Sequence, residues 1–148
     1  MLKNQDKEIF NIFKLLNENM FYFDKVAKFI IVMGIYFHVT GIFIGLDLFQ
    51  EKIFTLTLDK YVILIFCYAI IGLIYYYKSI SFSSKLQQFS YLLLAFWVAI
   101  SIPIHIMGQI NGTTSFIEGF PSWYSYFFLA IFLFLYYNFN KIKFQDKH

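Results

Sequence analysis

Two histidines stand inside long apolar stretches of this sequence, and both could do chemistry. His38 lies among glycines in the first such stretch, and His105 follows Pro103 in the third. An imidazole in apolar surroundings needs a partner for its N–H group, and near neutral pH it can take up or release a proton. These two side chains are therefore the first candidates for a binding or redox site.

The surroundings of His105 predict a polar pocket. On a helix, Ser101 lies one turn from His105 and Trp97 a further turn away on the same face. Pro103 cannot donate a backbone hydrogen bond, so it bends the helix and frees a carbonyl. The alternative is a proline kink with a structural role alone. Polar residues before and after the neighbouring apolar stretches could also face this pocket. Together the candidate residues are Asp47, Trp97, Ser101, Pro103, His105, Gln109 and Glu118.

Acidic residues of the loops on the outer side of the membrane could pair with His105, and the alternative is that they are simply solvated. Asp47 or Glu118 could form a carboxylate–imidazole pair with His105, an arrangement that tunes a histidine near neutral pH. No acidic residue lies inside an expected membrane span. Ion-coupled transporters and proton pumps usually place one there, so this absence argues against both classes.

A face of small residues surrounds His38. Gly34, His38, Gly41 and Gly45 follow one another at spacings of four, three and four residues, which places them on one side of a helix. Gly41 and Gly45 form a GxxxG pattern, which lets another helix approach closely. We expect this face to pack against a helix of this chain or of another protein. A hydrogen bond to that helix is the simplest role for His38, and a ligand role is the alternative.

Cofactor and metal sites have little support. His38 and His105 are weak candidates for metal ligands, or for binding haem or a quinone. Counted from the cytoplasmic end of each span, their depths differ by about 10 Å at about 1.5 Å per residue, which disfavours one haem held by both. No Walker loop, HExxH motif or nucleophile elbow is present, so the sequence points away from an enzyme.

The elements that must position these residues are membrane helices. Apolar residues make up 59% of the 148 residues and charged residues 14%, whereas a soluble domain carries about a quarter. Each long uncharged stretch approaches the roughly 20 residues that cross a bilayer. We expect an all-α integral membrane protein, an up-down four-transmembrane-helix bundle with an N-terminal interfacial amphipathic helix. Its parts are a cytoplasmic amphipathic segment at 1–25, a membrane domain at 26–139 with spans at 26–46, 61–77, 89–107 and 123–139, and a cytoplasmic tail at 140–148.

The lysines predict the orientation. Ten of the twelve fall in the N-terminal segment, the second loop and the tail, whereas only Lys52 and Lys60 fall on the other side. Because basic residues stay in the cytoplasm, both termini are expected there, in a bacterial inner membrane. The sequence has no basic stripe with interleaved aromatic residues, so it does not predict nucleic-acid binding.

These observations favour a non-enzymatic membrane protein. It would be a helix-packing subunit or would handle a small solute or a lipid. Its partners would be the bilayer and, through the Gly41 and Gly45 face, a second copy or another membrane protein. The alternative is a redox or cofactor protein that binds haem or a quinone through His105, His38 or both.

Overall fold

The computed structural model describes residues 23–43, 56–113 and 122–143. These residues are helical apart from short connections and ends. Most of the expected amphipathic segment, most of both outer loops and the last five residues lie outside the described part. The helices are α2 (Phe23–Phe43), α4 (Leu56–Tyr77), α5 (Lys85–Asn111) and α6 (Ser122–Phe139).

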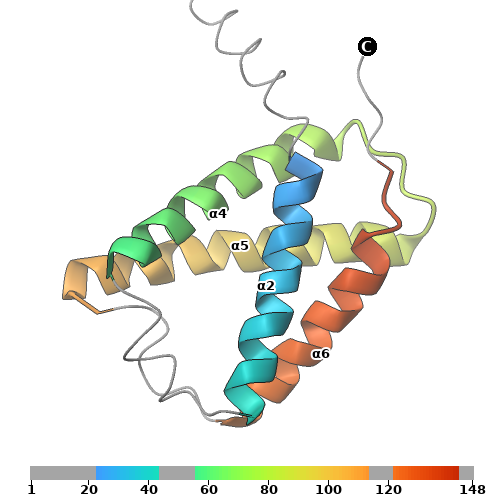
Figure 1. The fold of residues 1–148 in the computed structure, drawn as a ribbon. Coiled ribbons are helices and arrows are strands. Elements are labelled where there is room, and N and C mark those ends of the chain that lie inside the picture. Colours follow the sequence, from blue (N-terminus) through green and yellow to red (C-terminus); the bar gives the residue numbers. More distant parts are fainter. Residues whose placement is uncertain (1–22, 44–55, 114–121, 144–148) are drawn as a thin grey trace, which may run out of the picture.

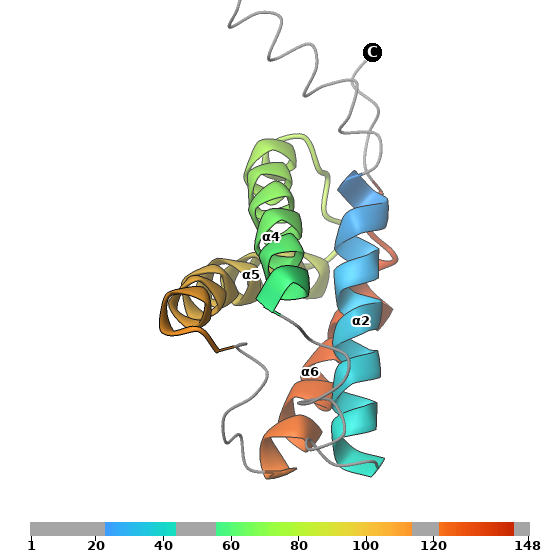
Figure 2. The ribbon, with the colours of Figure 1, turned by 60° about the vertical axis from the view of Figure 1, so that its left-hand side comes forward.

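The helices pack as two antiparallel pairs. α2 packs mainly against α6, and α4 against α5. Within the second pair, Tyr91 near the start of α5 bonds Leu73 near the end of α4, whereas His105 near the end of α5 bonds Asp59 near the start of α4. In Figure 1 the α4–α5 pair runs across the direction of the α2–α6 pair, and Figure 2 shows α2 and α6 lying side by side.

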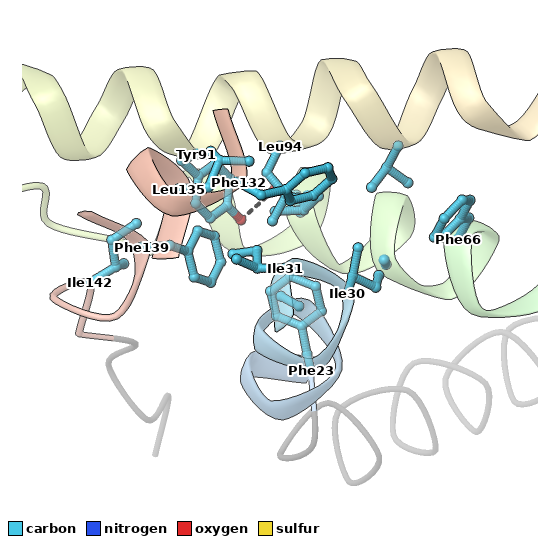
Figure 3. Close-up of a cluster of buried hydrophobic side chains, with 14 of the residues drawn as sticks. Phe23, Ile30, Ile31, Phe66, Tyr91, Leu94, Phe132, Leu135, Phe139 and Ile142 are labelled. Atoms are coloured by element: carbon cyan, nitrogen blue, oxygen red, sulfur yellow. Dashed lines mark hydrogen bonds between the residues drawn. The ribbon is translucent and has the colours of Figure 1, made fainter. Parts of the chain in front are cut away.

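One core joins the pairs where α2 and α5 begin and α4 and α6 end. Figure 3 shows side chains from all four helices converging there. The Phe23 ring stacks on Tyr76 of α4 with centroids 5.3 Å apart, and Tyr91 stacks on Phe139 of α6 at 5.9 Å. The Tyr91 hydroxyl donates to the Leu73 carbonyl at 2.7 Å, which satisfies its polar group inside the core.

The ends of α5 follow from its sequence. The Ser84 side chain accepts the Gln87 N–H, and the Gln87 side chain accepts the N–H of Ser83, the residue before the cap, in an arrangement close to a capping box. At the other end Gly112 adopts a φ of 71°, a left-handed conformation that glycine takes without steric cost. The helix continues unbroken through Pro103.

The outer surface of the described helices is apolar. α2, α4 and α5 are each long and apolar enough to cross a membrane. α6 is apolar as well, but with 18 residues it is shorter than the other three. Large side chains such as Phe43 and Ile110 are 80% and 78% exposed. Such a surface is unfavourable in water, so the chain associates with a membrane.

Candidate functional site

Asp59 is the most unusual residue of the described structure. α4 begins at Leu56, before the expected start at Tyr61, so Asp59 lies in the first turn of a helix long and apolar enough to span a membrane. A carboxylate is favourable at that end of a helix because the backbone N–H groups there carry partial positive charge. Its side chain is nevertheless completely buried. The sequence assigned Asp59 to the loop before the second span, whereas in the structure it lies on α4 itself.

His105 is the partner of this carboxylate. Its Nδ1 atom lies 2.6 Å from Oδ1 of Asp59, and the His105 side chain is only 7% exposed. When the carboxylate is ionised it can only accept, so Nδ1–H is the donor and the imidazole is held in one orientation. α4 and α5 are thus joined by a carboxylate–imidazole pair, a type of contact that is rare inside membrane proteins.

Gln109 completes the cluster. It lies one turn after His105 on the same face of α5, and its side-chain amide donates to Oδ2 of Asp59 at 3.0 Å and to the Leu56 carbonyl at 2.9 Å. Both carboxylate oxygens of Asp59 therefore accept hydrogen bonds from α5. We call Asp59, His105 and Gln109 the polar cluster.

Aromatic rings line the inner side of the polar cluster. The Phe66 ring meets His105 edge to face at 5.4 Å between centroids, and Trp97 meets Phe66 in the same way at 5.3 Å. Trp97 in turn contacts Phe132 of α6 at 4.9 Å. The polar cluster is thus closed off from the rest of the core by apolar rings.

The structure brings together only part of the expected pocket. His105 and Gln109 share a site, and Trp97 reaches it through Phe66. Ser101 is buried, but its hydroxyl donates to the Trp97 carbonyl of its own helix at 2.8 Å. Pro103 is exposed on another side of α5. The two acids expected to pair with His105 lie outside the described residues: Asp47 and Glu118.

Sequence reasoning missed Asp59 because it was assigned to a loop. The signal that could have found it is its register on α4. Asp59 precedes Phe66, Ala69 and Leu73 by seven, ten and fourteen residues, and all four are buried. That spacing places Asp59 on the packed face of an extended helix.

His38 belongs to a different part of the fold. Its ring stacks on Phe128 and Phe132 of α6 at 5.3 and 5.6 Å. The same face carries Gly34, where an added Cβ would collide with the Phe132 ring, and the buried Gly41. The small-residue face therefore packs against α6 of the same chain as far as it is described, and Gly45 lies outside the described residues. Within the described part of the chain, no hydrogen bond to the His38 imidazole is found.

The two histidines are held on different helix pairs. His38 packs between α2 and α6, whereas His105 is bonded across α4 and α5. In the parts of the chain that the structure describes, no group of three or more His, Cys, Asp or Glu side chains could hold a metal ion.

Comparisons with known proteins add no further guidance. No protein-family model matches the chain, and no curated protein and no solved structure matches it either.

Proposed function

We propose that this chain is an integral membrane protein of the bacterial inner membrane, with four spans and both termini in the cytoplasm. Three described helices of sufficient length support this, together with the apolar exterior. The excess of lysine at one end of the helices supports the orientation, because basic residues are retained in the cytoplasm. On this proposal the polar cluster lies toward the outer surface.

We also propose that the protein binds a small polar solute or a lipid headgroup at the polar cluster, and catalyses no reaction. The observation that carries this is the complete burial of Asp59 in a helix whose other charged residue, Lys60, is exposed. Burying a carboxylate and an imidazole costs several kcal/mol on general grounds, and apolar residues would join two helices at lower cost. Ionisable groups inside membrane proteins therefore tend to be functional.

The geometry suggests how a ligand would enter. Gln109 is partly exposed, whereas Asp59 and His105 are not. A ligand with a donor group would displace the Gln109 amide from Oδ2 of Asp59, while His105 stays on Oδ1. The rings of Phe66 and Trp97 would exclude water behind it and strengthen the polar contacts.

A ligand screen with a matched pair of variants tests this proposal. The purified protein is heated in mild detergent with inorganic cations, amino acids, choline or ethanolamine. We expect one class to raise the unfolding temperature, and this rise to vanish when Asp59→Leu and His105→Leu replace the pair by apolar packing. Tyr91→Phe, which removes a buried hydrogen bond at the other end of the same helix pair, should retain the rise. A screen without any stabilising class, or equal stabilisation of the double variant, would contradict the proposal.

A second candidate function is redox or cofactor binding. The observation in its favour is that Asp59 holds Nδ1 of His105, because a carboxylate behind an imidazole is the arrangement that orients histidine ligands of metals. Haem held by His105 would give a strong Soret band in the purified protein, and that band should be lost in His105→Ala but kept in His38→Ala. A colourless preparation would remove haem. A quinone would be sought by extraction of the purified protein with organic solvent.

A further inference from the structure

Positive charge is concentrated at one end of the described helices. α2 and α5 begin at this end, and α4 and α6 end there. Among the described residues its one acidic side chain is Asp24, which already pairs with Lys28 at 2.8 Å. Lys60 lies near the opposite end. The lysines at the charged end are Lys25, Lys28, Lys78, Lys85, Lys141 and Lys143.

Four of these lysines lie near two buried residues at this end of the fold. Ile80, in the connection between α4 and α5, and Ile142, just after α6, are both buried in the same core. Lys78 and Lys85 flank the first of these residues, and Lys141 and Lys143 flank the second. All four lysines are exposed. We call these four residues the lysine patch.

The lysine patch lies where the apolar surface ends. Tyr137 is 64% exposed, and Nζ of Lys141 lies 3.5 Å from the centroid of its ring. Tyrosine is favoured at the depth of lipid headgroups, because an apolar ring and a polar hydroxyl are both satisfied there. Just beyond Lys85, the side chains of Leu86 and Phe89 are each 56% exposed. Positive charge and apolar surface therefore adjoin one another.

Other groups nearby indicate how a phosphate could be held. Ser81 and Ser83 are exposed in the connection between α4 and α5, and their hydroxyls can donate hydrogen bonds to phosphate oxygens. The N–H groups of Gln87 and Ser83 at the start of α5 already have side-chain partners. The contacts would thus come from lysines and hydroxyl groups.

We propose that the lysine patch binds the headgroups of anionic phospholipids, with the acyl chains lying against Leu86, Phe89 and the neighbouring apolar surface. This combination favours a lipid over a free phosphate, because a free ion would make no use of the apolar surface. A lysine close to an anionic membrane strengthens binding by roughly fivefold, so four of them give a preference that can be measured. The proposal is independent of the polar cluster.

Native mass spectrometry of the full chain tests this proposal. The protein is purified in mild detergent and titrated with phosphatidylglycerol or phosphatidylcholine of the same chain length. We expect tighter binding of phosphatidylglycerol, weakened by salt because exposed charges are screened. Changing the four lysines of the patch to glutamine should remove the preference for phosphatidylglycerol over phosphatidylcholine. Lys60→Gln, at the opposite end, is the matched control and should leave the affinity unchanged.

Three results would overturn the proposal. Equal affinity for the two lipids would show that headgroup charge is not recognised. If Lys60→Gln lowered the affinity for phosphatidylglycerol as much as the single variant Lys85→Gln, only the net charge of the protein would matter. Full displacement of phosphatidylglycerol by millimolar inorganic phosphate would identify a site for free anions. Unfolding temperatures of the variants in phosphatidylcholine would identify a variant that has lost its fold. If the variant with all four lysines changed is unfolded, the double variant Lys78→Gln with Lys85→Gln would replace it.

Discussion

Nδ1 of His105 lies 2.6 Å from Oδ1 of Asp59, so one hydrogen bond between two buried side chains joins α5 to α4. The residues are 46 positions apart in the chain, and the antiparallel pairing of the helices brings them together. At the other end of the same pair, the Tyr91 hydroxyl bonds the Leu73 carbonyl. The helix pair is thus fixed by polar contacts near each end, with apolar packing between them.

Removing one partner of the Asp59–His105 pair should destabilise the protein more than removing both. Asp59→Leu alone leaves the imidazole buried without its acceptor, and His105→Leu alone leaves the carboxylate buried without that donor. Each single change should cost about 3–5 kcal/mol, whereas the double change should cost clearly less than their sum. Thermal unfolding of the four proteins in one detergent measures this coupling. Additive losses would show that the two side chains do not depend on each other.

Most of the fold was predictable from the sequence because it depends on local patterns. Uncharged stretches of about 20 residues predict helices suited to a bilayer, and the structure shows three such helices and a shorter fourth. The prediction of a packed face around His38 rests on small residues that recur at helical spacing. In the structure the His38 ring stacks on Phe128 and Phe132.

The partner of His105 was harder to predict because it depends on where α4 begins. A hydropathy pattern ends at the first charged residues, and Asp59 and Lys60 are adjacent. The helix nevertheless extends past both, because Asp59 is satisfied by α5 and Lys60 remains exposed. A tertiary contact thus overrides the local signal, and a single sequence does not show which acidic residue makes that contact.

Gln109 should contribute to stability through its two hydrogen bonds. Gln109→Ala removes the donors to Oδ2 of Asp59 and to the Leu56 carbonyl, and should lower the free energy of unfolding by about 1–3 kcal/mol. The matched control is Gln88→Ala, whose amide bonds the exposed Tyr77 hydroxyl. That change should cost no more than about 0.5 kcal/mol. Equal losses in the two variants would indicate that Gln109 stabilises the protein no more than Gln88 does.

Gly34 should tolerate no larger side chain while Phe132 is present. An added Cβ would collide with the Phe132 ring, so Gly34→Ala forces the ring or the two helices to move. We expect a loss of about 1–3 kcal/mol, as for other overpacked cores. Phe132 also contacts Trp97. In a Trp123→Phe background, where Trp97 is the only tryptophan, Gly34→Ala should therefore shift the tryptophan emission. Rescue of stability by Phe132→Leu would assign the effect to this contact.

Gly41 distinguishes packing within one chain from docking between chains. It is buried on the face that packs against α6. If the face also serves a partner, as the spacing of Gly41 and Gly45 predicts, Gly41→Leu should weaken self-association or co-purification of a partner in mild detergent. Gly34→Ala serves as the comparison, because its contact lies inside the chain. If both changes lower stability by similar amounts and neither alters the assembled mass, the face acts only within the chain.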